Sequence, residues 1–244
     1  MIQLSNRQIQ ILKNICEEFI ATAKPVGSLV LDQKYHLGVS SATIRNEMSQ
    51  LTQLGYLRKS HSSAGRCPTS TGLKFYVKNL MTPRKLSVAE EVGVREKVWD
   101  HRDNFEKMTE EATKELSRRT KSLAVLATDK GIFYSSGLAN LLEYDEFFDI
   151  DVTRAMLTLV DHVDFWLGVM EKAFDISDQE PFHLLVGEEL EKEFLRPCGF
   201  IYQSYQAGPN RGIVGVVGPA RLKYTEIVPL VDYMANLISE FGKI

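Results

Sequence analysis

Several features that would place the chain in a specialised class are absent from it. No run of about 18 consecutive apolar residues occurs, so no transmembrane helix is expected. The three cysteines (Cys16, Cys67 and Cys198) lie far apart, and they have neither the CxxC spacing of a zinc site nor the pattern of a disulfide framework. The first ten residues lack the basic and then apolar pattern of a signal peptide. We therefore expect a cytoplasmic protein that does not enter a membrane.

The common catalytic and ligand-binding motifs are also missing. No P-loop, GxGxxG, HExxH or GxSxG sequence occurs. Residues 186–189 place two carboxylates together, and residues 161–164 place a histidine between two acids, but solvated surface clusters explain both. His61 has no partner at metal-ligand spacing. The sequence thus predicts no catalytic, cofactor or metal site, and no enzyme.

The charge of the chain is unevenly distributed. The 244 residues have an ordinary globular composition, with 44% hydrophobic and 25% charged residues. Residues 1–82 hold ten Lys and Arg against four Asp and Glu, a net charge of +6, whereas the remainder holds 19 basic and 28 acidic residues, a net charge of −9. This asymmetry indicates a module that faces a polyanion, joined to one that does not. A chance imbalance of solvated surface is the alternative.

Three helices are predicted in the first 55 residues. A first amphipathic helix over 5–22 ends before Pro25, because the residue preceding a proline disfavours the helical conformation. A second, short helix begins near Ser28, and a third helix over 42–54 follows a turn that starts at Gly38. Two helices around a short turn match the helix-turn-helix pattern.

The second helix of such a pair usually lies in the DNA major groove, with its N-terminal residues at the base edges. The predicted contacts there are short hydroxyls, one guanidinium and one amide: Ser40, Ser41, Thr43, Arg45 and Asn46. Hydroxyls reach phosphates, whereas arginine can pair with guanine and asparagine with adenine. Ser40 or Ser41 can also cap the helix, and capping is compatible with DNA contact.

A basic hairpin is predicted after the third helix. Strands are expected at 56–60 and 66–69 around a turn of small residues, and a fourth helix begins at Ser70. Three helices followed by such a hairpin make a winged helix, whose wing lies along a phosphate backbone or enters a minor groove. The predicted wing contacts are Arg58, Lys59, His61, Ser62 and Arg66, and Ser28 and Lys74 are predicted as further backbone contacts. An ordinary surface turn is the alternative reading of the hairpin.

Four segments of this region, 25–28, 41–48, 54–57 and 61–69, closely resemble the N-terminal domain of the HrcA family. The resemblance covers residues 3–82 almost continuously. It implies a repressor of heat-shock chaperone genes that binds double-stranded DNA at an inverted-repeat operator as a homodimer. It also implies that a chaperonin keeps the repressor active until heat stress diverts it.

The remainder of the chain reads as helices and strands mixed. A linker is predicted at 83–88 and one long charged helix with a thin apolar stripe at 88–120, which suits a connector, a dimer seam or a helix packed on its own domain. The expected strands are 123–127, 131–134, 183–187, 200–205 and 212–217, and the expected helices are 152–163 and 224–242. Residues 164–169 fit a strand or a helix, and residues 210–212 are expected to form the last turn. The pattern predicts an α+β domain.

Three segments of this second region, 137–142, 186–189 and 215–224, also resemble HrcA, whose C-terminal core is GAF-like. Members of that family are usually longer, with an inserted dimerisation segment and additional strands before the first of these elements. Here only ten residues separate Leu126 from Gly137, so the chain is expected to be a shortened member.

Taken together, the predicted fold is α+β in three parts. Residues 1–82 form a winged helix-turn-helix DNA-binding domain, residues 83–121 a linker and connector helix, and residues 122–244 a GAF-like regulatory or dimerisation domain. The predicted function is sequence-specific repression of heat-shock genes, released on heat stress. One alternative is a winged-helix regulator whose C-terminal domain senses a small molecule or a redox state. Another is an enzyme that docks a partner through the winged helix.

Overall fold

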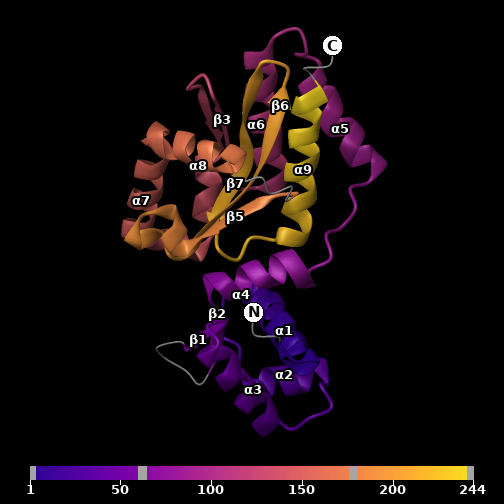
Figure 1. Cartoon of the computed structure of the whole chain (residues 1–244), viewed down its shortest axis with the longest axis vertical. Coiled ribbons are helices and arrows are strands. Elements are labelled where there is room, and N and C mark those ends of the chain that lie inside the picture. Colours follow the sequence, from indigo (N-terminus) through magenta and orange to yellow (C-terminus); the bar gives the residue numbers. More distant parts are fainter. Residues whose placement is uncertain (1–3, 60–64, 176–180, 241–244) are drawn as a thin grey trace. The chain divides into compact units, whose positions relative to one another are not determined.

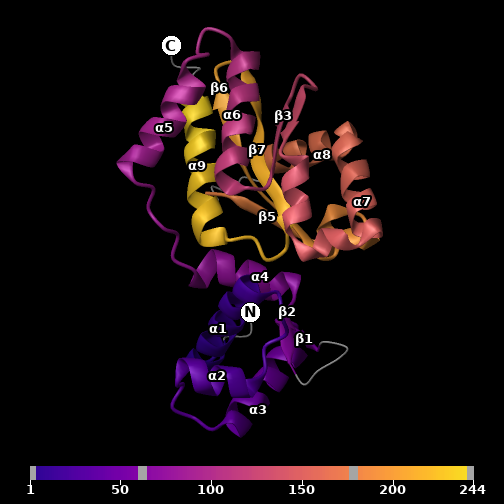
Figure 2. The ribbon, with the colours of Figure 1, turned by 180° about the vertical axis from the view of Figure 1, so that it is seen from behind.

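The chain contains both helices and sheet, arranged in two compact units, Met1–Thr82 and Pro83–Ile244 (Figures 1 and 2). The structure, a computed structural model, describes residues 4–59, 65–175 and 181–240. None of the described helices is long and apolar enough to cross a membrane.

The first unit consists of short helices and one antiparallel strand pair. Its elements are α1 (Asn6–Thr22), α2 (Ser28–Tyr35), α3 (Ser41–Gln53), β1 (Leu57–Lys59), β2 (Arg66–Pro68), α4 (Ser70–Phe75) and a turn of π-helix (Tyr76–Leu80). The three helices and the hairpin predicted from the sequence are confirmed, with bounds shifted by one or two residues.

Local capping explains where these helices begin and end. The Ser5 hydroxyl accepts the Gln8 N–H at 3.2 Å, while the Gln8 side chain accepts the Ser5 N–H at 3.0 Å, a reciprocal capping box. At the other end of α1, Ala23 adopts a left-handed conformation with φ 59°. Ser40 caps α3 by accepting the Thr43 N–H at 3.2 Å.

Apolar side chains from all the main helices fill the core of the first unit. Its fully buried members include Ile11, Leu12, Ile15, Leu31, Ile44, Leu51 and Leu57. A polar contact also joins α1 to α2, because the buried Glu18 carboxylate accepts hydrogen bonds from Lys34 and, at 3.0 Å, from the Tyr35 hydroxyl. The bond from Lys34 lowers the pKa of Glu18, although burial opposes this, and burial with the Glu18 contact raises the pKa of Tyr35 to about 12.

Strand β2 is paired on both of its edges. On one side it pairs antiparallel with β1, with Lys59 opposite Arg66. On the other side the Val26 and Arg66 backbones exchange two hydrogen bonds of 2.9 Å each. The segment between α1 and α2 therefore anchors β2 at Arg66, where the strand follows the hairpin loop.

The second unit is larger and has a five-stranded sheet. Its helices are α5 (Val88–Trp99), α6 (Phe105–Thr120), α7 (Ile150–Asp161), α8 (Val163–Asp175) and α9 (Tyr224–Glu240). Its strands are β3 (Leu123–Thr128), β4 (Phe133–Ser136), β5 (His183–Val186), β6 (Cys198–Ala207) and β7 (Asn210–Pro219). Short 3₁₀ turns occupy Leu138–Glu143, Asp145–Phe148, Gly187–Leu190 and Glu193–Leu195.

The five strands are all antiparallel to their neighbours, in the order β4-β3-β7-β6-β5. Helices cover both faces of the sheet: α6 and α9 pack on one face and α8 on the other, with α7 next to α8 (Figure 1). Burial on both faces explains why β3 and β7 are apolar nearly throughout.

Trp166 is at the centre of the core on the α8 face. It is fully buried, donates its indole N–H to the Leu159 carbonyl at 3.0 Å, and packs edge-on against Phe165 and Phe200 and stacked against Phe133. Residues 164–169, which fitted a strand or a helix, thus lie in α8, where the helical period directs Phe165, Trp166 and Val169 into this core.

Two sequence predictions about the second unit are wrong. The long helix expected over 88–120 is two helices, because Asn104 leaves the helical conformation and caps α6 by accepting the Lys107 N–H at 3.0 Å. The turn expected at 210–212 lies earlier, at Gly208 and Pro209, since Gly208 takes φ 59° and Asn210 already pairs with Ala207.

Candidate nucleic-acid interface

The exposed face of α3 carries no carboxylate. Ile44, Met48 and Leu51 turn into the core, which leaves the opposite side of the helix to solvent. The exposed residues there are Ala42, Arg45, Asn46, Ser49, Gln50 and Gln53. No described residue pairs with Arg45 or Asn46 through a hydrogen bond or ion pair, so both side chains are available to a ligand.

The one acid of α3, Glu47, is turned toward α1. Its carboxylate lies 3.6 Å from the Arg7 guanidinium and accepts a hydrogen bond from the Gln8 amide at 3.2 Å. The same amide donates to Gln50 at 2.8 Å. The Glu47 carboxylate is thereby paired with Arg7 and Gln8 of α1, away from the exposed residues of α3.

The N-terminus of α3 presents the predicted hydroxyls, each with a structural partner. Ser40 caps the helix and its hydroxyl lies 3.1 Å from that of Thr43, while the Ser41 hydroxyl lies 3.3 Å from that of Ser28. Ser28 is itself buried, which does not favour the direct phosphate contact predicted for it. The hydroxyls of Ser40, Ser41 and Thr43 are exposed or half-buried beside free N–H groups of a helix N-terminus, which favours anions.

The hairpin brings two further cations to the surface. Arg58 and Lys59 are exposed on β1, and their side chains make no hydrogen bond or ion pair to any residue that the structure describes. Arg66, on β2, is half-buried, and its guanidinium donates to the Thr52 hydroxyl at 3.2 Å and to the Gly65 carbonyl at 3.4 Å. Arg66 therefore has a structural role, joining the hairpin to the end of α3, that the sequence did not reveal.

The remaining predicted contacts divide into two groups. His61 and Ser62, predicted at the tip of the wing, lie outside the described residues. Lys74 lies on α4, is half-buried and has an interaction of its own.

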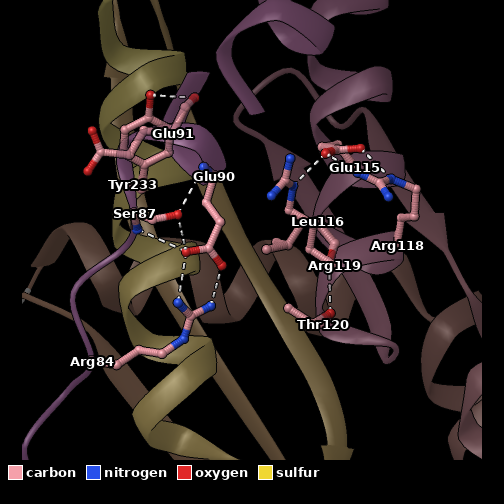
Figure 3. Close-up of polar contacts among 10 residues, drawn as sticks. All are labelled: Arg84, Ser87, Glu90, Glu91, Glu115, Leu116, Arg118, Arg119, Thr120 and Tyr233. Carbon is pink, nitrogen blue, oxygen red and sulfur yellow. Dashed lines mark hydrogen bonds and ion pairs between the residues drawn. The ribbon is translucent and has the colours of Figure 1, made fainter. Parts of the chain in front are cut away.

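Many Lys and Arg side chains of the second unit, unlike Arg45, Arg58 and Lys59, form ion pairs with carboxylates. Among them are Arg84, Arg95, Lys114, Arg118, Arg119, Arg154, Lys172, Arg196, Arg211 and Arg221. Figure 3 shows two of these clusters. In one, Arg84 donates to both oxygens of Glu90 at 2.9 and 2.6 Å, and in the other Glu115 accepts from Arg118 and Arg119. Other cations of this unit, such as Lys97, Lys107 and Lys223, are exposed and form no ion pair with a described residue.

The three cysteines are buried and free of disulfides. Burial raises the pKa of Cys16, Cys67 and Cys198 alike. For Cys67 this outweighs the opposing effect of Arg58. A reactive thiol requires a low pKa and access to solvent, so all three are inert in this fold. No group of three His, Cys, Asp or Glu side chains suited to a metal ion occurs in the described part of the chain.

Comparison with known proteins identifies the family. A family model described as "HrcA protein C terminal domain" matches residues 74–228. A heat-inducible transcription repressor HrcA from Acetivibrio thermocellus is 24% identical over 338 aligned positions, which cover 97% of this chain and 96% of the relative. The repressor of the same name from Symbiobacterium thermophilum is 24% identical over 342 positions, covering 99% of each chain.

These comparisons place the chain among transcription repressors. More particularly, it belongs to the HrcA family of heat-inducible transcription repressors. Both alignments are longer than the chain's 244 residues, so the relatives carry stretches that this chain lacks, as expected for a shortened member.

One solved structure supports the fold over the full length. A crystal structure of a hypothetical protein aligns with a TM-score of 0.73 at 20% identity, covering 98% of this chain and 99% of the other.

Proposed function

We propose that the chain represses heat-shock genes by binding an inverted-repeat operator as a homodimer, with residues 1–82 as a winged helix-turn-helix DNA-binding domain. The observation that carries the DNA-binding surface is the α3 face, which has unpaired Arg45 and Asn46 and no exposed carboxylate. Arginine and asparagine are the side chains that pair bidentately with guanine and adenine in the major groove.

In this proposal α3 and the hairpin contact different parts of the DNA. Arg45 and Asn46 read base edges, while Ser40, Ser41 and Thr43 hold phosphates at the start of α3. The hairpin follows the backbone through Arg58, Lys59 and Arg66 together with His61 and Ser62. Lys74 is retained as an additional backbone contact and Ser28 acts indirectly, since its buried hydroxyl orients that of Ser41.

We propose the second unit as a GAF-like regulatory and dimerisation domain. Its five-stranded antiparallel sheet with helices on both faces is compatible with that fold. A chaperonin remains the proposed modulator that keeps the repressor active until heat stress.

The alternative regulator, which senses a redox state, receives no support from the buried thiols with raised pKa values. The version that senses a small molecule stays a prediction.

The experiment compares three duplexes: a chaperone-promoter inverted repeat, one half-site, and a scrambled sequence. Stoichiometry and affinity are measured by fluorescence anisotropy over a range of salt concentrations. We expect two chains to bind the full repeat far more tightly than either other duplex. Equal and steeply salt-dependent binding to all three would contradict sequence-specific repression, because it would reflect backbone contacts alone.

A further inference from the structure

Residues 138–164 expose an unusual number of large apolar side chains. Six of the eleven exposed large hydrophobic residues among those described lie in this stretch: Leu138, Leu142, Phe148, Ile150, Leu157 and Val163. Phe148 is 72% exposed and Ile150 65%. Scattered apolar side chains are normal on a protein surface, whereas contiguous exposed apolar patches mark interaction sites.

The backbone that carries these side chains is fixed by a polar network. Gly137, with φ 87°, turns the chain after β4, and a Cβ there would overlap the Ser117 hydroxyl. The Asn140 amide donates to the Ser117 hydroxyl and to the Ser122 carbonyl, both at 3.2 Å. The Ser122 hydroxyl in turn lies 3.1 Å from the Tyr144 hydroxyl. The segment is therefore tied at several points to the end of α6.

A bidentate ion pair fixes the next turn. The Arg221 guanidinium donates to the two oxygens of Glu146 at 2.6 and 3.0 Å, and it lies over the Tyr144 ring. Both charged side chains are more than four-fifths buried. The apolar residues Leu141 and Phe147 enter the core, so Leu142 and Phe148, their immediate neighbours, are turned outward.

The outward side chains lie on adjoining elements. The two 3₁₀ turns, Leu138–Glu143 and Asp145–Phe148, pack against each other, and the second packs against α7. On α7, Ile150 and Leu157 are seven residues apart and so share one face of the helix. We call the exposed side chains of residues 138–164 the apolar-acidic surface, because they are both apolar and strongly acidic.

This surface is strongly negative. Residues 138–164 contain seven carboxylates and one Lys or Arg, Arg154, which is paired with Asp151. Glu146 is paired with Arg221. The other five carboxylates form no ion pair with any described residue: Glu143, Asp145, Asp149, Asp161 and Asp164. A symmetric contact between two copies of this surface would set these acids against each other, which argues against a second copy as the occupant.

We propose that the apolar-acidic surface docks a basic amphipathic segment of another protein, one that carries apolar side chains flanked by Lys or Arg. Phe148, Ile150 and Leu157 supply the apolar contact, and the five unpaired carboxylates select the basic flanks. The surface is preformed, so little ordering accompanies binding. This partner is distinct from DNA, whose phosphates these carboxylates repel.

The probe consists of two labelled helical peptides with the same leucine face, one with lysine and one with glutamate on the polar face. Fluorescence anisotropy measures their binding to the full-length protein. We expect the lysine peptide to bind at least tenfold more tightly than the glutamate peptide, with an affinity that falls as salt rises. Equal binding of the two peptides, or binding of neither, overturns the proposal.

Two variant pairs locate the binding site. Phe148→Ser with Ile150→Ser should weaken the lysine peptide at least tenfold, and Glu143→Gln with Asp145→Asn should weaken it and reduce its salt dependence. Val88→Ser with Val92→Ser, exposed apolar positions on α5, is the matched control and should change nothing. Loss of binding in the control, or none in the first pair, contradicts the assignment.

Self-association is checked by light scattering on the same proteins. A dimer that dissociates only in Phe148→Ser with Ile150→Ser would assign the surface to a second copy and overturn the proposal.

Discussion

The two units of this repressor differ in which of their charged side chains form ion pairs. In the first unit three of the four acids, Glu17, Glu18 and Glu47, are held in ion pairs with Lys13, Lys34 and Arg7, while Arg45, Arg58 and Lys59 are left without a described partner. In the second unit ten cations form ion pairs, among them Arg84, Arg118 and Arg221, and carboxylates outnumber cations by 28 to 19. Net charge alone indicates the sign of each unit. The pairing determines which charges can meet a ligand.

The largest expected loss of stability comes from a substitution beside the hydrogen bonds of Ser117 and Asn140 in the second unit. Gly137→Ala should destabilise that unit by about 3 kcal/mol or more, because the residue has φ 87° and its Cβ would overlap Ser117 and lie 2.6 Å from the Asn140 amide nitrogen. Both tryptophans, Trp99 and Trp166, lie in this unit, so denaturation followed by tryptophan fluorescence reports on it alone.

The control is Gly131→Ala, which has a similar φ of 76° but open space around the added Cβ. It should cost about 1 to 2 kcal/mol, the contribution of the left-handed backbone alone. Equal losses in the two variants would mean that the Ser117 network does not constrain the chain.

The next largest expected effect is a loss of DNA affinity when Arg45, a cation without a described partner in the first unit, is removed. Arg45→Ala should weaken operator binding by about 1–3 kcal/mol and relax specificity at one base pair, while binding to random DNA changes little. Lys107→Ala, an exposed cation of α6, is the matched control and should leave both affinities unchanged. Equal losses of Arg45→Ala on operator and random DNA would remove its role in base reading.

A smaller loss of stability is expected when the Glu18–Lys34 ion pair of the first unit is broken. Glu18→Gln should cost about 1–2 kcal/mol, since the amide cannot replace the charged bond to Lys34. The pKa of Glu18 is lowered in the folded state. Its stabilising contribution is therefore present above the unfolded pKa of about 4.3 and is lost as pH falls through the lower folded pKa.

Hydrogen exchange of the α1 and α2 amides measures this contribution as a function of pH. The variant should differ from the unaltered protein near pH 6 and converge with it in acid. A constant difference at all pH values would show that shape, and not ionisation, accounts for the loss.

The smallest effect tests the backbone contact of the hairpin. Lys59→Ala should weaken binding to every duplex alike and lower the slope of log affinity against log salt by about one. A loss confined to the operator would instead give Lys59 a role in reading sequence.

The sequence predicted the first unit well because its signals are local. Ser5, Pro25 and Gly38 act on neighbouring residues, and the helical period of α3 alone identifies which side is buried. The sequence did less well with the second unit. The break between α5 and α6 depends on Asn104 preferring to cap a helix over continuing one, and the place of residues 164–169 depends on the pocket that Trp166 fills.

In the candidate site too, local features could be predicted from the sequence and long-range partners could not. The sequence identified Arg45, Asn46, Arg58 and Lys59 as available for DNA, and the structure leaves them exposed. It also predicted that Arg66 and Ser28 contact DNA. Their side chains, however, form hydrogen bonds with Thr52 and Ser41, which are distant in the sequence. A side chain's chemistry is visible in the sequence, whereas its partner across the fold is not.

The sequence by itself determined the family, the division of charge and most of the helices and strands, because these depend on composition, periodicity and motifs that neighbouring residues define. Only the tertiary structure decided which ions are paired, that the three thiols are buried, and that six large apolar side chains of residues 138–164 are exposed. Each of these depends on contacts between residues far apart in the chain, where burial and distance determine the energy of a charge or an apolar group.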